Sequence, residues 1–179
     1  MTKKLTCLLL ACLCVLSLAA CGSGEIEATS EPFPEFAATD FDGNSLTNEM
    51  FGDYDATVVN FWSNGCGSCI AEMPELEAYY QDFKEKNINL IGVAVSAGNS
   101  QEECDLAHEI LDGKGVTYTN LIPNIESDFY KEFIDSLTGY PTTYIVDSEG
   151  NIIGAPLLGV VSGQEEKMMD RIDSILEKK

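Results

Sequence analysis

The feature that most constrains this chain is an apolar strand pattern followed directly by a pair of cysteines. Residues 56–62 read ATVVNFW, a β-branched and aromatic run that predicts a strand buried on both faces. Cys66 and Cys69 come next, and from Ser68 to Lys86 apolar residues recur at the spacing of a helix. We therefore expect both thiols at the junction of a buried strand and a helix.

The rest of the chain alternates between strand and helix patterns. Residues 88–95 predict a second buried strand, and because a helix joins it to the first, the two strands should be parallel. The turn residues Asp42-Gly43 predict a hairpin within 36–46. Further expected elements are helices over 101–111 and 125–137, an antiparallel hairpin of strands 142–146 and 151–155, and a last helix opened by a capping box at 162–165, with Met169, Ile172 and Leu176 facing inward. This order predicts an α/β fold with a mixed sheet.

The N-terminus has the pattern of an export signal. Lys3 and Lys4 precede an apolar run over 5–18, and Leu18-Ala19-Ala20-Cys21 follows. Small residues ending in a cysteine match the lipoprotein signal, in which that cysteine is lipidated and becomes the first mature residue. The alternative is an ordinary cleaved signal peptide that carries a cysteine at its end. We expect a signal peptide over 1–20 and a lipid on Cys21, which ties the domain to a membrane surface.

The remaining chain is long enough for one domain and strongly acidic. Removal of 1–20 leaves 179 − 20 = 159 residues, and with both signal lysines gone the formal charge is 8 − 30 = −22. Such a surface argues against nucleic acid as a partner and against a basic membrane-binding face. Residues 21–35 are rich in Gly, Ser, Glu and Pro and predict a flexible tether, so the folded domain should cover 36–179.

The position of the two cysteines suggests redox chemistry. A helix start presents unpaired N–H groups and the positive end of the dipole, which lower a thiol pKa from about 8.5 toward about 3.5–7.5. Cys66 should therefore attack and Cys69 should resolve the mixed disulfide. A structural staple over so short a loop would stabilise little, and a metal site would need a second cysteine pair or histidines. His108 is the only histidine and is expected on the surface, so we expect neither a metal nor another cofactor.

Cys104 is a third cysteine of the expected mature domain. It lies in the sequence Glu102-Glu103-Cys104-Asp105, where neighbouring carboxylates oppose a thiolate. It shares a helical face with apolar residues. We expect a structural, unreactive thiol, with a role as a third redox partner as the alternative.

From about Pro34 to the C-terminus the chain resembles the thioredoxin superfamily, specifically its TlpA/ResA-like membrane-anchored thiol–disulfide oxidoreductases. The resemblance is carried by VVNFW, Cys66-Gly67-Ser68-Cys69 with Pro74 five residues later, and Gly139-Tyr140-Pro141-Thr142-Thr143 followed by YIVDSEGNII. It implies a thioredoxin-like three-layer α/β/α sandwich with a mixed central sheet and an N-terminal β-hairpin extension.

The resemblance also implies roles for several residues. The proline that matches Pro141 is cis in the family and lies against the disulfide, and the backbone before it binds an extended substrate peptide. We therefore expect Tyr140, Pro141 and Trp62 at the substrate site. Glu72 matches an acidic residue three positions after the second cysteine. It is expected either to exchange a proton with the buried thiol or to be a solvated helix residue.

Two positions depart from the family pattern. An aromatic residue usually precedes the first cysteine, and here it is Gly65. Gly67-Ser68 replaces the Gly-Pro of thioredoxin, and Ser68 adds donors that favour the Cys66 thiolate. A stabilised reduced form is a stronger oxidant, so the pair should be less reducing than thioredoxin at about −270 mV. The direction of electron flow is thereby left open.

These observations predict an exported thiol–disulfide oxidoreductase anchored as a lipoprotein on the outer face of the cell membrane. The resemblance implies reduction by a CcdA-type membrane thiol donor, and clients such as apocytochrome c in cytochrome c maturation. A thiol peroxidase is disfavoured, because superfamily peroxidases place Thr two residues before a single reactive cysteine and Asn64 stands there. A non-catalytic lipoprotein that binds a ligand or partner is the alternative from another class.

Overall fold

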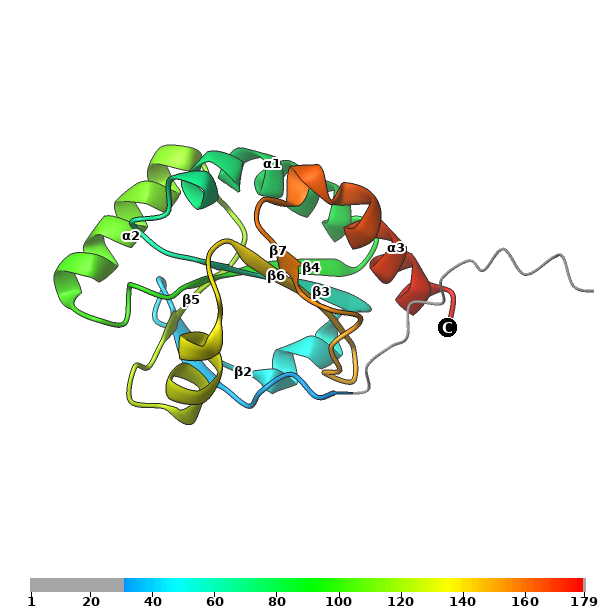
Figure 1. The fold of residues 1–179 in the computed structure, drawn as a ribbon, viewed down its shortest axis with the longest axis horizontal. Helices are drawn as coiled ribbons and strands as arrows, with labels where there is room; N and C mark the ends of the chain where they lie inside the picture. The colour runs from blue at the N-terminus through cyan, green and yellow to red at the C-terminus, as the bar shows by residue number, and fades with distance from the viewer. Residues whose placement is uncertain (1–30, 179) are drawn as a thin grey trace, which may run out of the picture.

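The computed structural model describes residues 31–178, so the expected signal peptide and Cys21 lie outside the described residues. The described chain forms a mixed sheet of seven strands in the order β2-β1-β5-β4-β3-β6-β7 (Figure 1). Its strands are β1 (Ala37–Asp40), β2 (Ser45–Thr47), β3 (Ala56–Trp62), β4 (Ile88–Ala94), β5 (Asn120–Pro123), β6 (Thr142–Asp147) and β7 (Leu157–Leu158). Its helices are α1 (Gly67–Lys84), α2 (Gln101–Lys114) and α3 (Glu165–Leu176), with short helical segments η1 (Asn48–Asp53), η2 (Phe129–Phe133), η3 (Ile134–Ser136) and η4 (Val161–Gly163).

The centre of the sheet is built from the strands that carry the β-branched runs. β3 pairs with β4 in parallel and with β6 in antiparallel, and every residue of β3 and β4 is buried. The predicted parallel pair and the N-terminal hairpin, β1 with β2, are both confirmed. Because β3 lies between β4 and β6, the residues that follow it are held on a rigid support.

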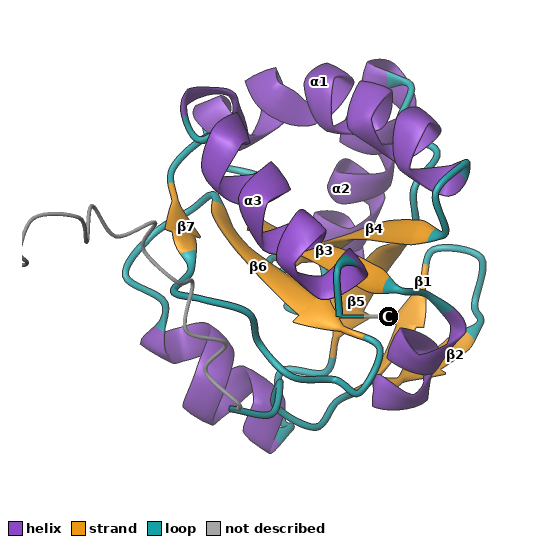
Figure 2. Ribbon diagram, turned by 90° about the vertical axis from the view of Figure 1, so that its right-hand side faces the viewer, coloured by secondary structure: helices purple, strands orange, loops and turns teal. Residues whose placement is uncertain are grey.

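Helices and short helical segments cover the two faces of the sheet, which gives three layers. Figure 2 shows α1, α2 and α3 on one face and short helical segments on the other. The segment η4 is an exception, because Val161 packs with α1 and α3. The face under α1 and α3 is mainly aliphatic, whereas the opposite face is a cluster of aromatic rings. The expected thioredoxin-like three-layer sandwich is confirmed.

Phe33 moves the start of the folded domain ahead of the predicted boundary. It is 3% exposed, and its ring centroid lies within 6.4 Å of six others. Its N–H donates to the carbonyl of Gly150 at 2.8 Å, and Pro32 bridges to Asn151. The tether expected over 21–35 therefore cannot extend to Glu35, because an aromatic side chain within it gains burial in the core.

Two elements in the middle of the chain differ from the predictions. β5 was not predicted, since it is short and ends in a proline. The helix predicted over 125–137 is instead a π-helical turn followed by a 3₁₀ turn. Its buried residues Phe129 and Ile134 are five positions apart, a spacing that a π turn places on one face and an α-helix does not.

The last strand and the last helix also differ in detail. Of the strand predicted over 151–155, only Asn151 and Ile152 form bridges, and the strand beside β6 is β7. The predicted capping box is wrong, because the residue that precedes α3 is Gln164 and its side chain donates to the Leu158 carbonyl at 2.9 Å. The buried residues of α3 are Met168, Ile172 and Ile175, so the inward face is turned by about one residue and Met169 and Leu176 are only partly buried.

Candidate active site

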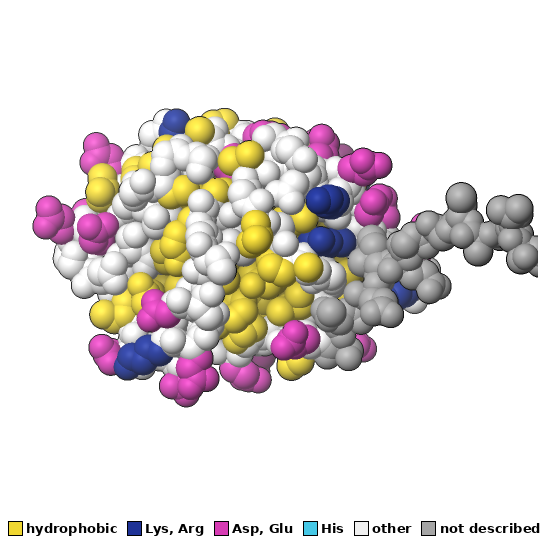
Figure 3. Space-filling view, viewed as in Figure 1, with side chains coloured by type: hydrophobic (Ala, Val, Ile, Leu, Met, Phe, Trp, Pro, Cys, Tyr) yellow, Lys and Arg dark blue, Asp and Glu magenta, His cyan; other side chains and the backbone are white. Residues whose placement is uncertain are grey.

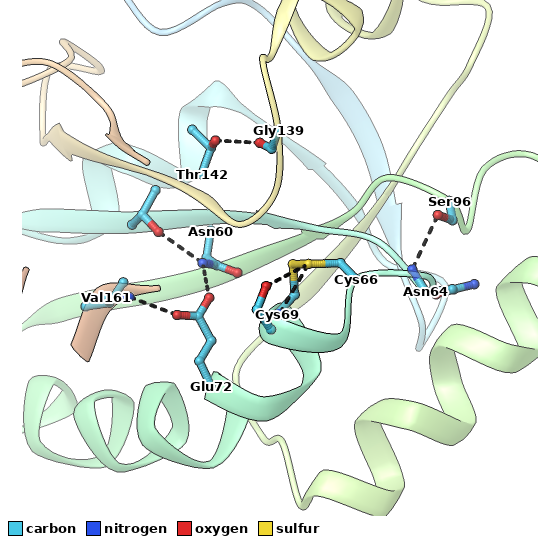
Figure 4. Close-up of a disulfide and its surroundings, with 11 residues drawn as sticks. Asn60, Asn64, Cys66, Cys69, Glu72, Ser96, Gly139, Thr142 and Val161 are labelled. Atoms are coloured by element: carbon cyan, nitrogen blue, oxygen red, sulfur yellow. Dashed lines mark hydrogen bonds between the residues drawn. A yellow bond between two sulfur atoms is a disulfide. The ribbon is translucent and has the colours of Figure 1, made fainter. Parts of the chain in front are cut away.

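Cys66 and Cys69 form a disulfide at the start of α1, as the sequence predicted (Figure 4). Cys66 is the N-cap residue, and its sulfur accepts a hydrogen bond from the Cys69 N–H at 3.2 Å. Cys66 is partly exposed, whereas Cys69 is 1% exposed. Cys66 is therefore the more accessible sulfur of the pair.

Ser68 adds a polar contact that a proline at this position could not make. Its hydroxyl oxygen lies 3.5 Å from the Cys66 sulfur, and its side chain is exposed. After reduction this hydroxyl and the unpaired N–H groups of the first helical turn can donate to a Cys66 thiolate. The geometry therefore favours the charged form of Cys66.

Glu72 is buried, so the expectation of a solvated helix residue is wrong. It is 5% exposed and points from α1 toward the sheet. Its Oε1 accepts from the Asn60 amide at 3.2 Å, and its Oε2 accepts from the Val161 N–H at 2.9 Å. Burial, opposed by these two hydrogen bonds, raises the pKa of the Glu72 carboxyl above its ordinary value.

Asn60 joins Glu72 to the sheet, and sequence reasoning did not single it out. The same amide nitrogen donates to the Thr143 hydroxyl at 3.0 Å, and Asn60 is 2% exposed. The signal was present in VVNFW, because a polar residue in a fully buried strand must find partners. Glu72, Asn60 and Thr143 thus connect α1, β3 and β6 close to the disulfide.

The residues expected at the substrate site separate into two groups. The Tyr140–Pro141 peptide bond is cis, as the resemblance implied, and Tyr140 packs against the apolar cluster that contains Cys69. Trp62 belongs to the same cluster but is 1% exposed, and its indole N–H donates to Asn120 at 2.8 Å. Burial leaves Trp62 no surface for a client, so it supports the pair through packing.

The remaining candidates, His108 and Cys104, are not part of the disulfide. His108 has a side chain that is 57% exposed, as expected. Cys104 is a free, partly buried thiol whose pKa is raised by burial and by Asp105. It lines a cavity of about 610 Å³ between the β1–β2 hairpin and the start of α2, to which neither cysteine of the disulfide contributes. Residues 31–178 contain no cluster of side chains suited to a metal ion.

Comparison with known proteins agrees with this geometry. Residues 29–155 match the AhpC/TSA family. The chain is 26% identical over 140 residues to the thiol-disulfide oxidoreductase ResA of Halalkalibacterium halodurans, covering 76% of this chain and 73% of that protein. It is 30% identical over 121 residues to the thioredoxin-like protein YneN of Bacillus subtilis, covering 64% and 66%.

A solved structure shows the same fold. The thioredoxin domain of a thiol-disulfide oxidoreductase from Bacteroides vulgatus is 27% identical, with a TM-score of 0.62, covering 79% of this chain and 97% of that one. Together with the cysteine pair at the start of α1, these likenesses support a thiol–disulfide oxidoreductase of the ResA type. The chain belongs to the AhpC/TSA family of thioredoxin-like proteins.

Proposed function

We propose that this protein reduces disulfides of exported client proteins through the Cys66–Cys69 dithiol. The observation that carries the proposal is the asymmetry of the pair, with a partly exposed Cys66 at the helix start and a buried Cys69 within reach of its sulfur. Cys66, Cys69 and Glu72 are the proposed catalytic residues. Tyr140 and Pro141 are proposed to contact the client, and Trp62 to support the pair from within the core.

The reaction transfers two electrons to the client in two exchanges. In the first, the Cys66 thiolate attacks one client sulfur, forms a mixed disulfide and releases the other client sulfur as a thiolate, which takes up a proton. In the second, Cys69 loses its proton and attacks Cys66, which closes the Cys66–Cys69 disulfide and releases the second client thiolate. Glu72 is proposed to influence that proton transfer from its buried position on the same helix face.

The membrane attachment is part of the proposal. Among residues 31–178 no helix is long and apolar enough to cross a membrane. The N-terminal pattern that ends in Cys21 supports a lipid anchor on the outer face of the cell membrane. A CcdA-type membrane thiol donor is the proposed source of electrons, and apocytochrome c is one proposed client. Figure 3 shows acidic side chains along the outline of one face, which does not favour nucleic acid as a partner.

The two other functions fit less well. Asn64 stands where a superfamily peroxidase would have its threonine, and its amide is engaged with Glu103. A non-catalytic binding protein would have no use for an exposed sulfur at a helix start. Reduction of insulin, followed by precipitation of its free B chain, distinguishes an oxidoreductase from both. If the parent protein reduces insulin no faster than the Cys66→Ser variant does, the proposed activity is excluded.

A further inference from the structure

The loop that leads from β3 to Cys66 has no side chain at the residue directly before Cys66. Gly65 stands in the position where the resemblance implies an aromatic residue, and it is exposed. A Cβ atom built on Gly65 would point into open space, because no atom outside its two chain neighbours lies within 4 Å. The position of Cys66 must therefore be fixed by other contacts.

Asn64 supplies these contacts by binding the start of α2. Its amide nitrogen donates to the Glu103 carbonyl at 2.9 Å and to the Glu103 carboxylate at 2.7 Å. Its backbone N–H lies 3.4 Å from the Ser96 hydroxyl, as Figure 4 shows. Both N–H groups of the amide are used. The opposite orientation would turn the amide oxygen toward two other oxygens, so the side chain has one favourable arrangement.

Glu103 is a firm support for this contact. Its N–H donates to the Ser100 hydroxyl that caps α2, at 3.2 Å. α2 in turn is held by Ala107 and Leu111, which are 0% and 6% exposed and pack in the cluster that contains Cys69. From Asn64 the connection to the reactive residue is short, because the Cys66 N–H donates to the Ser63 carbonyl at 3.0 Å.

We propose that Asn64 and Glu103 are positioning residues that hold the sulfur of Cys66 at the start of α1. Helix α2 thereby supports the reactive loop through Glu103. The inference rests on the proposed function only in naming Cys66 as the attacking residue. It assigns no contact with the client to either side chain.

The chemistry of the contact provides a sharp variant. Asn64→Asp keeps the shape of the side chain but removes both donors and places a carboxylate against the Glu103 carboxylate. Glu103→Gln added to that variant offers an amide donor to the new carboxylate, which restores the side-chain contact with its polarity reversed. Asn99→Asp is the matched control for charge, since Asn99 is an exposed residue close to the start of α2 and its side chain takes no part in the Asn64–Glu103 contact.

The test measures Cys66 in a reduced protein that carries Cys69→Ser and Cys104→Ser, in which Cys66 is the one cysteine left after Cys21. The rate of its reaction with iodoacetamide is followed against pH, and the rate of attack on 2-hydroxyethyl disulfide is measured at pH 7. We expect Asn64→Asp to slow the attack about tenfold and to shift the pH profile of alkylation. A factor of ten corresponds to about 1.4 kcal/mol. The added Glu103→Gln should recover part of the loss, and Asn99→Asp should behave as the parent.

Two results would overturn the inference. One is a parent rate and a parent pH profile in Asn64→Asp, which would make the contact merely structural. The other is a loss that Glu103→Gln does not reduce, which would trace the effect to charge or to misfolding. Because Cys66 reactivity is measured without any client, a failure here is distinct from a failure of client reduction.

Discussion

The carboxylate of Glu72 accepts a hydrogen bond at 2.9 Å from the backbone N–H of Val161, which lies 89 residues further along the chain. Two residues before Val161, the backbone N–H of Gly159 donates to the carbonyl of Pro141 at 2.9 Å. The helix that carries the disulfide and the loop before β6 are therefore tied to the same segment. Replacement of Glu72 should therefore disturb both α1 and the loop before β6.

Glu72→Ala should lower the free energy of unfolding by about 1–3 kcal/mol, because it leaves buried donors without an acceptor. Urea denaturation of the oxidised protein measures this loss. Glu72→Gln should cost less, since its amide oxygen can still accept from Val161 and the Asn60 amide can turn. Glu109→Ala, at an exposed position of α2, is the control. Equal stability of Glu72→Ala and the control would contradict the buried network.

The raised pKa of Glu72 predicts how stability depends on pH. Burial raises the pKa of the folded carboxyl above that of the unfolded chain, so the folded state binds the proton more tightly. The stability that this tighter proton binding adds is fully present below the unfolded pKa of about 4.3, and it is lost as the pH rises through the folded pKa. The difference in unfolding free energy between the parent and Glu72→Gln should therefore shift against the parent over that interval. A difference that stays constant with pH would show that the carboxyl has no raised pKa.

The exposure of the two sulfurs predicts which variant traps a client. Cys69→Ser keeps the attacking residue and removes the resolving one, so mixed disulfides should accumulate. They are detected by non-reducing electrophoresis and mass spectrometry after acid quenching. Cys66→Ser is the matched control and should trap nothing. The reverse pattern would exchange the two assigned roles.

Ser68→Pro should make the pair more reducing. The change removes a hydroxyl 3.5 Å from the Cys66 sulfur and one backbone N–H. The first turn of a helix tolerates proline, so the fold should be kept. The thiolate loses donors, so the reduction potential should become more negative than that of the parent, as measured by equilibration with glutathione. Ser68→Ala should lie between the two. An unchanged reduction potential in both variants would show that Ser68 does not stabilise the Cys66 thiolate.

The proposed lipid anchor has a direct test in Cys21→Ser. If Cys21 carries the lipid, the variant should leave the membrane fraction of the expressing cell and appear in the soluble or secreted fraction. Immunoblotting of fractionated cells measures the distribution, with Cys104→Ser as a control that keeps the lipid site. Membrane association of Cys21→Ser equal to that of the parent would count against the lipoprotein proposal.

Sequence patterns predicted the two fully buried strands and the amphipathic helix that joins them. β3, β4 and α1 lie within two residues of their predicted bounds at each end, because continuous apolar runs and helical periodicity leave little choice there. The cysteine pair was located correctly for the same reason. What failed was set by tertiary contacts: β5 exists because β1 and β4 pair with it, and η2 follows the aromatic cluster that it covers.

The environment of Glu72 shows why site details were harder to predict than site positions. Helical spacing placed it one turn after Cys69, but only the fold brings Val161 and Asn60 to its two oxygens. Asn64 and Glu103 lie 39 positions apart, and no local pattern in the sequence links them. Local sequence predicts where a side chain stands on its own element, whereas its partners depend on how the elements pack.

The burial of Phe33 in the core fixes the end of the sheet at which the described chain begins. Glu31 and Pro32 lie beside Asn151 and Ile152, at the end of the β3–β6 ladder where Ala56 faces Asp147. Cys66 follows Trp62 at the other end of that ladder, and Figure 1 shows the described chain beginning away from the start of α1. The proposed N-terminal attachment therefore holds the domain from one end of this ladder. The reactive sulfur lies at the opposite end of the ladder from the residues at which the described chain begins.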